Sequence, residues 1–397
     1  MAMDNVRIAV IGLGNMGSQH SQWLFEGKIK GATLAAICDS NPEKLREFRE
    51  KFNDKVPAFP THKGVVNCGW VDAIIVAVPH YDHVPIALDA FEKNVHVMLE
   101  KPIAVSVKAA AEVVEAYKKY PHLKFGIMLN QRNNVTYQKM REMIASGELS
   151  EISRITWICT NWFRSNAYYA SGGWRATWKG EGGGILINQC PHYLDLVQWI
   201  PNMMPNRVTA VASIGKTHPI EVEDEVNAIM EYPNGATGHF VTSTGECPGS
   251  NRLEIVGSRG TLICDNGGKL TFRRNRVDAQ EFNRTTTTSF GIPEVWNIEI
   301  PTTSRATLGE HNQTTQNFVN VILKNEPNEK LLSPGPDGFN GLHLGNAMLM
   351  AGLMRKPVDL PVDGDKFDAF IEDLAQKYGG KKTLEAKTSQ VNMGASW

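Results

Sequence analysis

The sequence has almost no net charge. Its 41 Lys and Arg residues nearly balance 42 Asp and Glu residues, which leaves a formal net charge of -1. A chain without an excess of basic residues has no overall field to hold a nucleic-acid backbone or an anionic membrane surface. The composition therefore argues against both partners.

Long apolar runs and paired cysteines are also missing. No apolar stretch approaches the roughly 20 residues that cross a bilayer, and residues 1–7 are too few and too polar for a signal peptide. The six cysteines are scattered, with no C-x-x-C pair and no Cys/His block at zinc spacing. We therefore expect no metal site, and free thiols in a reducing compartment, the cytoplasm.

The 397 residues, 42% of them hydrophobic, are enough for two domains with their own cores. Up to about residue 128, short apolar runs alternate with amphipathic stretches, as they do in parallel βαβ units. Strands are expected at 7–11, 33–38, 73–78, 95–99 and 124–128. The first domain is therefore predicted to be an α/β domain over residues 1–128.

The pattern changes after about residue 130. Segments with alternating apolar residues are joined by Gly- and Asn-rich turns, which is typical of antiparallel strands. These strands are expected at 208–214, 226–232, 236–242, 253–256 and 261–264, and helices at 186–200, 312–324 and 342–355. Residues 129–397 are thus predicted to form an α+β domain on a mostly antiparallel open sheet, whose polar tail after about Leu384 is loosely ordered or docks on a partner subunit.

A glycine pattern lies between the first strand and a helical stretch. Gly12 permits a tight turn, Gly14 lets a phosphate approach the backbone, and Gly17 lets the helix pack close to the strand. Together with Asn15 and Met16, they are expected to form a loop that binds a pyrophosphate at the helix N-terminus. The alternative is a plain turn, but the order of strand, glycines and helix favours a Rossmann dinucleotide-binding domain.

Asp39 ends the second strand, followed by Ser40. A carboxylate at this place accepts hydrogen bonds from the adenosine ribose hydroxyls and repels a ribose phosphate. The sequence therefore predicts NAD in preference to NADP, although Asp39 could also simply flank the following helix.

Two further loops follow strands of the same sheet. Ligands of such sheets bind at the carboxyl ends of the strands. Residues after the strands 73–78 and 95–99 are therefore expected to face the ribose and the nicotinamide. They are Val78, Pro79, His80, His83, Glu100 and Lys101, with Asn130 after the last strand. His80 and His83 could instead cap or cover the next helix, whereas Lys101 has no role in sheet packing, and Pro102 stiffens its turn.

These motifs together resemble one family. The loop Gly12–Gly17, then Glu100-Lys101-Pro102, then Gly182-Gly183-Gly184 followed by Asn188, His192 and Asp195, look like the glucose-fructose oxidoreductase / inositol dehydrogenase (Gfo/Idh/MocA) family. The resemblance covers essentially the whole chain. It implies an NAD-dependent oxidoreductase that is a homodimer or homotetramer.

The family usually works with a lysine, an acidic residue and a histidine, which correspond here to Lys101, Asn188 and His192. An amide cannot carry a proton away, so Asn188 is expected to bind or orient the substrate, and Asp is expected to be tolerated in its place. His192 is then the general base, and the Lys101 ammonium stabilises alkoxide charge. The alternative for His192 is a helix histidine with a purely structural role.

Asp195 completes a predicted helix face with Asn188 and His192, at positions i, i+4 and i+7 of helix 186–200. It could position His192, bind a substrate hydroxyl, or be structural. His311 could reach the substrate, but the simpler expectation is that it caps the helix that follows it.

Aromatic and basic residues precede the glycine triplet. Flat aromatic rings cover the C–H face of a sugar, and fixed polar groups bind its hydroxyls. Arg164, Tyr168 and Trp174 are therefore expected to bind substrate. Trp174 and Arg175 also resemble a family pair that lies near the nicotinamide and the substrate. The aromatic residues could equally be packed in the core or at a subunit interface.

Within the family, these stretches look most similar to enzymes that oxidise carbon 3 of glucosides, levoglucosan or related sugars. We therefore expect an NAD-dependent oxidoreductase that acts on a secondary hydroxyl, at C3, of a glucoside. The alternatives are an inositol-type polyol dehydrogenase, a redox-neutral NAD-dependent glycosidase and, from a different class, a non-catalytic dinucleotide-binding regulator.

Overall fold

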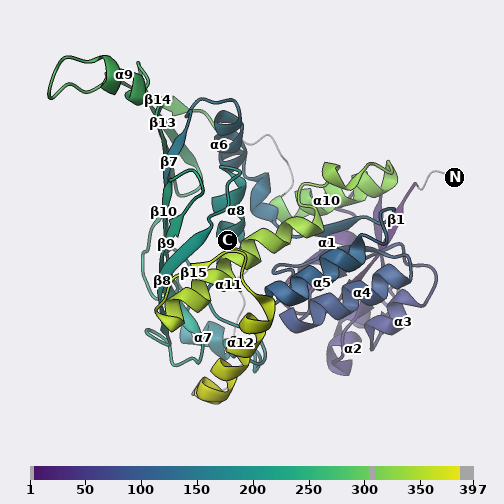
Figure 1. Cartoon of the computed structure of the whole chain (residues 1–397). Helices are drawn as coiled ribbons and strands as arrows, with labels where there is room; N and C mark the ends of the chain where they lie inside the picture. Colours follow the sequence, from purple (N-terminus) through teal and green to yellow (C-terminus); the bar gives the residue numbers. More distant parts are fainter. Residues whose placement is uncertain (1–3, 304–308, 385–397) are drawn as a thin grey trace.

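The computed structural model describes residues 4–303 and 309–384, so the tail predicted after Leu384 lies outside the described residues. The chain forms two sheets with helices between and around them (Figure 1). Within the described residues, no helix is long and apolar enough to cross a membrane.

The first sheet has six parallel strands in the order β3-β2-β1-β4-β5-β6. They are β1 (Val6–Ile11), β2 (Ala32–Cys38), β3 (Ala58–Phe59), β4 (Ala73–Val76), β5 (His96–Leu99) and β6 (Phe125–Ile127). All expected strands are present, and only the two-residue edge strand β3 was not predicted. The order reverses between β1 and β4, the switch point where a Rossmann fold binds its ligand.

Helices cover both faces of this sheet. On one face lie α3 (His62–Val66), α4 (His83–Glu92) and α5 (Val107–Tyr117). On the other face lie α1 (Asn15–Phe25) and α10 (Glu310–Leu323), whose buried Phe318 and Val319 join one core with Ile8 and Val10. The chain therefore returns from its second half to complete the core of the first. The helix α2 (Pro42–Lys51) contacts the edge strand β3.

The second sheet has nine strands in the order β14-β13-β12-β11-β7-β10-β9-β8-β15. They are β7 (Ile152–Cys159), β8 (Arg207–Ile214), β9 (Glu223–Glu231), β10 (Thr237–Ser243), β11 (Asn251–Gly257), β12 (Gly260–Asp265), β13 (Lys269–Asn275), β14 (Val295–Ile300) and β15 (Val358–Asp359). Neighbours are antiparallel except β7 and β10. The mostly antiparallel sheet is thus confirmed, although β7, β13, β14 and β15 were not predicted.

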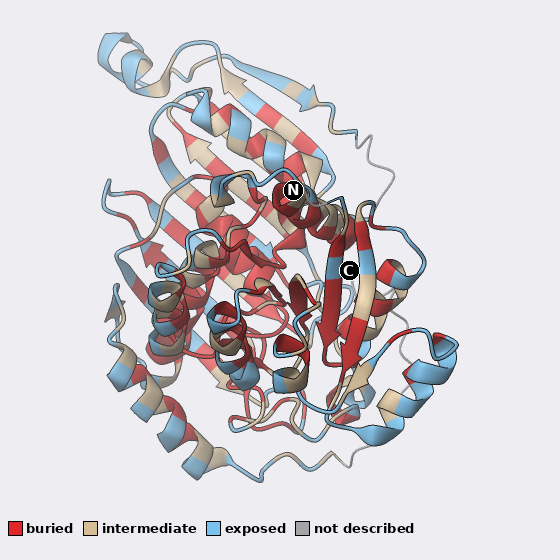
Figure 2. Ribbon diagram, turned by 90° about the vertical axis from the view of Figure 1, so that its right-hand side faces the viewer, coloured by how far each residue is buried: buried red, intermediate tan, exposed pale blue. Residues whose placement is uncertain are grey.

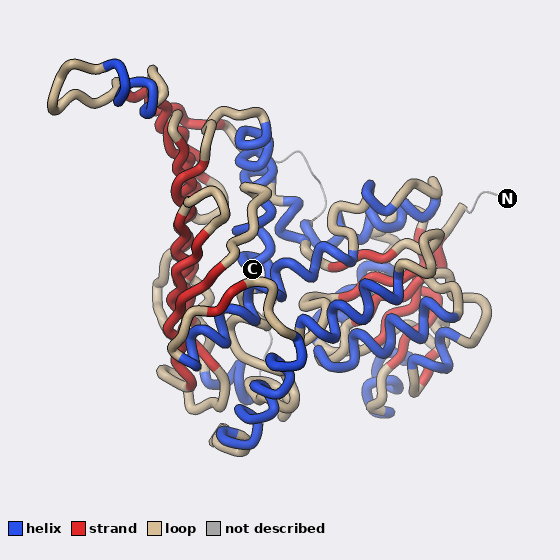
Figure 3. Tube along the Cα trace, in the orientation of Figure 1, coloured by secondary structure: helices blue, strands red, loops and turns tan. Residues whose placement is uncertain are grey.

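One face of this sheet is covered and the other is open. The helices α6 (Val135–Ala145), α8 (Pro191–Trp199) and α11 (Gly338–Met354) pack between the second sheet and the first domain (Figures 1 and 3). Residues along its strands alternate between buried and accessible, as Figure 2 shows by colour. The remaining helices are α7 (Asn166–Ala170), α12 (Gly364–Tyr378) and α9 (Ala279–Thr285), of which α9 projects beyond the sheet (Figure 1).

The helix expected at 186–200 is shorter than predicted. The α-helix α8 begins at Pro191, and the Cys190 amide donates to Ile185 O, five residues back, while the Leu194 amide donates to Cys190 O. Proline has no amide hydrogen, so a helix from residue 186 cannot continue regularly through it. Asn188 therefore lies in a turn before the helix, and the expected shared face of Asn188, His192 and Asp195 does not form.

Candidate active site

The glycine loop after β1 is built for close contacts. Gly12 has a φ of +91°, and a Cβ atom on Gly17 would lie 1.7 Å from the main-chain oxygen of Gly12. A Cβ on Gly14 would meet nothing within 4 Å. Gly14 also caps α1 without a side-chain hydrogen bond, so the first amide groups of the helix, beginning with Asn15 and Met16, remain available for an anion.

Asp39 lies beside this loop at the end of β2. Its carboxylate accepts hydrogen bonds from the amides of Leu13 and Asn41, both at 2.8 Å, and Lys44 Nζ lies 4.0 Å away. The carboxylate is therefore fixed next to the glycine loop, with the exposed Ser40 following it. This arrangement matches the one expected for ribose recognition.

His80 and His83 follow β4 and the partly exposed Val78 and Pro79, and both are buried. His83 Nδ1 lies 2.7 Å from Pro102 O, and His83 Nε2 lies 3.0 Å from Val78 O. His83 therefore joins the loops after β4 and β5, a structural contact that was not among the expected roles. His80 Nδ1 donates to the main-chain oxygen of Glu181 at 2.9 Å, which joins the two domains.

Glu100 is buried at the end of β5. Its carboxylate accepts from His20 Nε2 at 2.8 Å and from the Lys101 amide at 3.2 Å. Burial acts to raise the pKa of Glu100, but the hydrogen bond from His20 and the nearby positive charges outweigh it and hold that pKa at about 2. Glu100 therefore supplies a fixed negative charge next to Lys101.

Lys101 and His192 are the two predicted catalytic residues. Lys101 Nζ donates to the main-chain oxygen of Asn188 at 2.7 Å, so the ammonium is anchored to the turn before α8. Burial lowers the pKa of Lys101, while Glu100 and Glu181 act to raise it. Burial, together with the charges of Lys101 and His311, lowers the pKa of His192 to about 3. His192 is therefore neutral at physiological pH.

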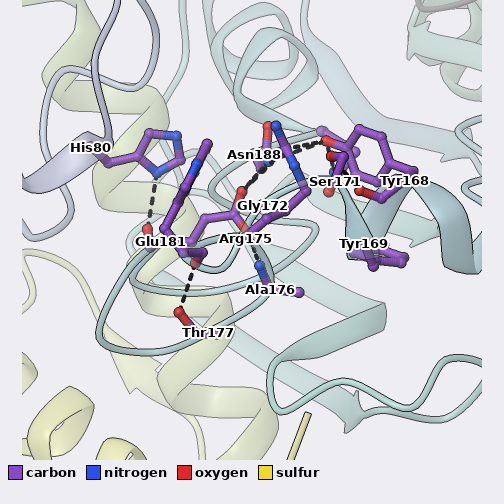
Figure 4. Close-up of polar contacts among 12 residues, drawn as sticks. His80, Tyr168, Tyr169, Ser171, Gly172, Arg175, Ala176, Thr177, Glu181 and Asn188 are labelled. Carbon is purple, nitrogen blue, oxygen red and sulfur yellow. Dashed lines mark hydrogen bonds and ion pairs between the residues drawn. The ribbon is translucent and has the colours of Figure 1, made fainter. Parts of the chain in front are cut away.

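The predicted substrate-binding residues form a chain of contacts. The hydroxyl of Tyr168 accepts from Arg175 Nη1 at 2.6 Å and from Asn188 Nδ2 at 3.3 Å. The Arg175 guanidinium stacks on the rings of Tyr168 and Trp174, and that of Arg164 stacks on Tyr168. The structure therefore brings these side chains together beside Asn188, as Figure 4 shows for Tyr168, Arg175 and Asn188.

Asp195 lies apart from this group. Both of its carboxylate oxygens accept from the buried Arg132, at 2.6 Å and 2.8 Å, and one also accepts from Gln198 at 3.2 Å. Arg132 in turn donates to Asp337 at 2.6 Å. These contacts occupy the carboxylate and favour the structural alternative for Asp195. The sequence reading missed Arg132, which follows Asn130 by only two positions.

Asn130 and His311 lie in contact with each other. Asn130 Nδ2 lies 3.2 Å from His311 Nδ1, and the buried Asn130 Oδ1 has no partner within the described part of the chain. The helix α10 is capped by Gly309, and the His311 ring packs near His20 and Trp23. The expectation that His311 caps the helix is therefore wrong, because its side chain faces the interior.

Two buried carboxylates near the glycine triplet were not found from the sequence. Glu223 accepts from the amides of Gly184 and Leu186, and a Cβ on Gly184 would lie 1.9 Å from its main-chain oxygen. The glycine triplet is therefore held in place by Glu223. Glu181 lies directly before the triplet and contacts Asn188 and Arg175. The only signal for Glu181 in the sequence was its place directly before the glycine triplet.

The residues present fit a nicotinamide dinucleotide. The open space at Gly14, the uncapped start of α1 and the fixed Asp39 would hold the pyrophosphate and the adenosine ribose. The unpartnered Asn130 Oδ1 and the ammonium of Lys101 would lie on the nicotinamide side. The fold and the site thus define a two-domain protein with an NAD-type Rossmann domain and a polar site beside the carboxyl ends of its strands.

Family models match both domains. Residues 6–125 match the oxidoreductase family with an NAD-binding Rossmann fold, and residues 137–263 match the GFO/IDH/MocA C-terminal domain. The chain therefore belongs to the GFO/IDH/MocA oxidoreductase family, and its first domain is an NAD-binding domain.

Individual relatives are distant. The chain is 24% identical over 237 residues to an inositol 2-dehydrogenase of Corynebacterium glutamicum, a match that covers 58% of this chain and 65% of that relative, less than two thirds of its length. The fold of this chain is similar to that of the WlbA dehydrogenase from Bordetella pertussis, which was crystallised in complex with NADH and UDP-GlcNAcA. The TM-score is 0.75 and the identity 22%, and the match covers 91% of this chain and 100% of that one. The fold is also similar to that of levoglucosan dehydrogenase in complex with NADH and levoglucosan. The TM-score is 0.71 and the identity 19%, and the match covers 90% of this chain and 100% of that one.

Asp39 is expected to set the cofactor preference. A ribose phosphate would meet this carboxylate, which is already bound to the glycine loop, so NAD should bind at least tenfold more tightly than NADP, on the order of 1.4 kcal/mol. Asp39→Ala should remove most of that difference. Titrations of both cofactors by fluorescence would measure it. Equal binding of NAD and NADP by the unmodified protein would contradict the assignment.

Proposed function

We propose that this protein is an NAD-dependent oxidoreductase that oxidises a secondary hydroxyl group of a sugar or polyol. The proposal is carried by one observation, the combination of an anchored ammonium and a buried neutral imidazole. Lys101 Nζ is held by Asn188 O at 2.7 Å, and His192 Nδ1 is buried without a partner among the described residues. Lys101 follows the carboxyl end of β5, and the Lys101 charge contributes to the lowered pKa of His192.

These residues would share the proton chemistry. Oxidation of an alcohol needs the hydroxyl proton to leave as the carbon loses a hydride, and NAD, when bound, accepts that hydride. His192 accepts the proton as its neutral imidazole. Lys101 stabilises the charge that develops on the oxygen, and the turn that carries Asn188 keeps its ammonium in position.

The substrate we propose is a glucoside oxidised at C3. Tyr168, Trp174 and the stacked Arg164 and Arg175 provide the aromatic and polar surfaces on which sugars bind. The similarity in fold to levoglucosan dehydrogenase supports a pyranose-like substrate. Inositol is the second candidate, since a relative is named inositol 2-dehydrogenase.

A panel of glucosides, free sugars, levoglucosan and inositols, each with NAD, would test the proposal. We expect absorbance of reduced cofactor together with a product two hydrogens lighter, whose carbonyl lies at C3. Oxidation of inositols alone would select the polyol alternative. Cleavage of a glycosidic bond without net reduced cofactor would select the redox-neutral glycosidase. Binding of NAD without any turnover across the panel would reject the enzyme and leave the regulator.

We expect the protein to act in the cytoplasm. All six of its cysteines are unpaired, which suits a compartment that keeps thiols reduced. Detection of the native protein in an oxidising compartment would contradict this.

The open face of the nine-stranded sheet is expected to bind a second copy of the chain. Ile158 on β7, Val211 on β8 and Ile229 on β9 are 37%, 45% and 47% exposed, which is unusual for a group of aliphatic residues on one sheet. Closed symmetric association through such a face would cover them. We therefore predict a homodimer or homotetramer.

Light scattering of the purified protein would measure the mass of the assembly. A monomeric mass at working concentration would contradict the predicted homodimer or homotetramer. Ile229→Glu should lower the mass of the assembly, because it would bury a charge in the contact. Met354→Glu is the matched control, since Met354 is 43% exposed at the end of α11, a helix packed on the opposite face. It should leave the mass unchanged.

A further inference from the structure

Glu181 is a buried carboxylate in contact with the proposed catalytic residues. It is 1% exposed and lies directly before the glycine triplet. Its carboxylate accepts from Asn188 Nδ2 and from the Ala176 amide at 2.5 Å, and Arg175 Nη1 lies 3.6 Å away. Figure 4 shows these groups around the Glu181 side chain, whose main-chain oxygen also binds His80.

All partners of this side chain are donors. An ionised carboxylate only accepts hydrogen bonds, so an amide N–H, a side-chain NH2 group and a guanidinium suit the charged form. Burial raises the pKa of Glu181 overall, although Arg175, the Ala176 amide, Asn188 and Lys101 act to lower it. The hydrogen-bond donors and the guanidinium around Glu181 therefore oppose the effect of burial and favour the anion.

The contact also fixes the direction of the Asn188 amide. Because Glu181 accepts, the NH2 group of Asn188 must face it, and the Tyr168 hydroxyl receives a second bond from the same nitrogen. The side-chain oxygen of Asn188 is thereby left as an acceptor for a substrate hydroxyl. Asn188 meanwhile holds Lys101 through its main-chain oxygen. One residue therefore links Glu181 to the ammonium.

Other charged and titratable groups also act on Lys101. They are Glu100, Glu181, Arg164, Arg175, His80, His192 and His311. The three histidines have pKa values lowered by burial, so they are neutral at physiological pH. The two arginines act to lower the pKa of Lys101, whereas the carboxylates of Glu100 and Glu181 act to raise it and so favour the charged ammonium.

We propose that Glu181 is a positioning residue that supplies the negative charge absent from position 188. It keeps Lys101 protonated and directs the acceptor oxygen of Asn188 toward the substrate. The family's usual pair of a lysine and an acidic residue is thus replaced by Lys101, Asn188 and Glu181 acting together. This inference rests on the proposed function, because the substrate hydroxyl and the role of Lys101 come from it.

The pH dependence of Glu181→Gln tests the charge. Glutamine keeps the size but removes the anion, so the pKa of Lys101 should fall by about one unit. Loss of activity with rising pH should then begin about one unit lower in the variant. Glu221→Gln is the matched control, since Glu221 is a buried carboxylate that accepts from the amides of Trp178 and Gly380, and it should leave that pH unchanged. An unshifted profile in Glu181→Gln would overturn the proposal.

A readout that needs no turnover separates this inference from the proposed function. Acetylation of Lys101 by acetic anhydride at graded pH, followed by mass spectrometry, gives its pKa in each variant without substrate. A lower pKa in Glu181→Gln but not in Glu221→Gln supports the inference even if no sugar is oxidised. Equal values in the three proteins would overturn it, whereas failure of the sugar panel alone would overturn only the proposed function.

A charge exchange tests the same idea through Asn188. The resemblance alone favours tolerance of Asn188→Asp, but Glu181 would then face a second carboxylate, so kcat/KM should fall at least tenfold. The double variant Glu181→Gln with Asn188→Asp has a single carboxylate again and should recover most of that loss. A fully active Asn188→Asp, or a double variant no better than the single one, would contradict the proposal.

Discussion

Lys101→Ala and His192→Ala are each expected to slow hydride transfer by on the order of a hundredfold or more while NAD still binds. Neither side chain supports the glycine loop or Asp39, so the dinucleotide should keep its main contacts. The two losses should not add, because the residues act on one hydroxyl group. Single-turnover formation of reduced cofactor would measure the rate, and fluorescence titration the binding of NAD.

Asn188→Ala provides the contrast. An amide transfers no proton, so its loss should act mainly through substrate affinity, as a higher KM. The main-chain oxygen that holds Lys101 remains in this variant. A fall in kcat as large as that of His192→Ala would show that Asn188 does more than bind.

The pH profile tests His192 separately. Its pKa of about 3 predicts that the imidazole stays neutral from pH 7 down to pH 5, so activity should not fall over this range through its protonation. Near wild-type single-turnover rates in His192→Ala across pH would reject it as the base. His311, His83 and Asp195 would then be tested in its place.

Asp195→Asn is expected to destabilise the protein by about 3–5 kcal/mol, with little effect on KM in the folded fraction. The substitution would leave Arg132, which is 2% exposed, as a buried cation without its two-bonded partner. Asp337 would remain near one side of the guanidinium, but its carboxyl group is partly exposed. Urea unfolding would measure the loss.

Asp359→Asn is the control for this prediction. Asp359 pairs with Arg207 at 2.6 Å on the surface, where an ion pair contributes little to stability. If Asp195→Asn left stability unchanged and raised KM, Asp195 would be a substrate ligand after all. The buried ion pair would then have to be dispensable.

The N-terminal domain illustrates what local pattern can predict. Short apolar runs define strands, the glycine loop needs backbone conformations and contacts that a side chain would block, and Asp39 lies at a fixed distance from it. The motif that carries Lys101 follows a strand directly, so its place at the sheet edge also follows from the sequence. These features depend on neighbours close in the chain.

The site beyond that edge depended on distant contacts. Pro191 was visible in the sequence, but the turn that sends Asn188 O toward Lys101 was not, because the partners are 87 positions apart. Whether Asp195 binds a ligand or Arg132 likewise depended on a residue 63 positions away. Glu181 gains its significance only from Asn188, Arg175 and Lys101, which meet it in the folded chain.

The sequence by itself determined the parallel sheet, the glycine loop, the open antiparallel sheet and the place of Lys101 directly after a strand, since each rests on periodicity or on a short motif. Only the tertiary structure decided that α10 completes the core of the first domain, that His311 faces inward and that Asp195 is held by Arg132. An amphipathic helix or a lone carboxylate is compatible with many partners. The partner is selected by burial and charge pairing across the whole fold, which no local pattern contains.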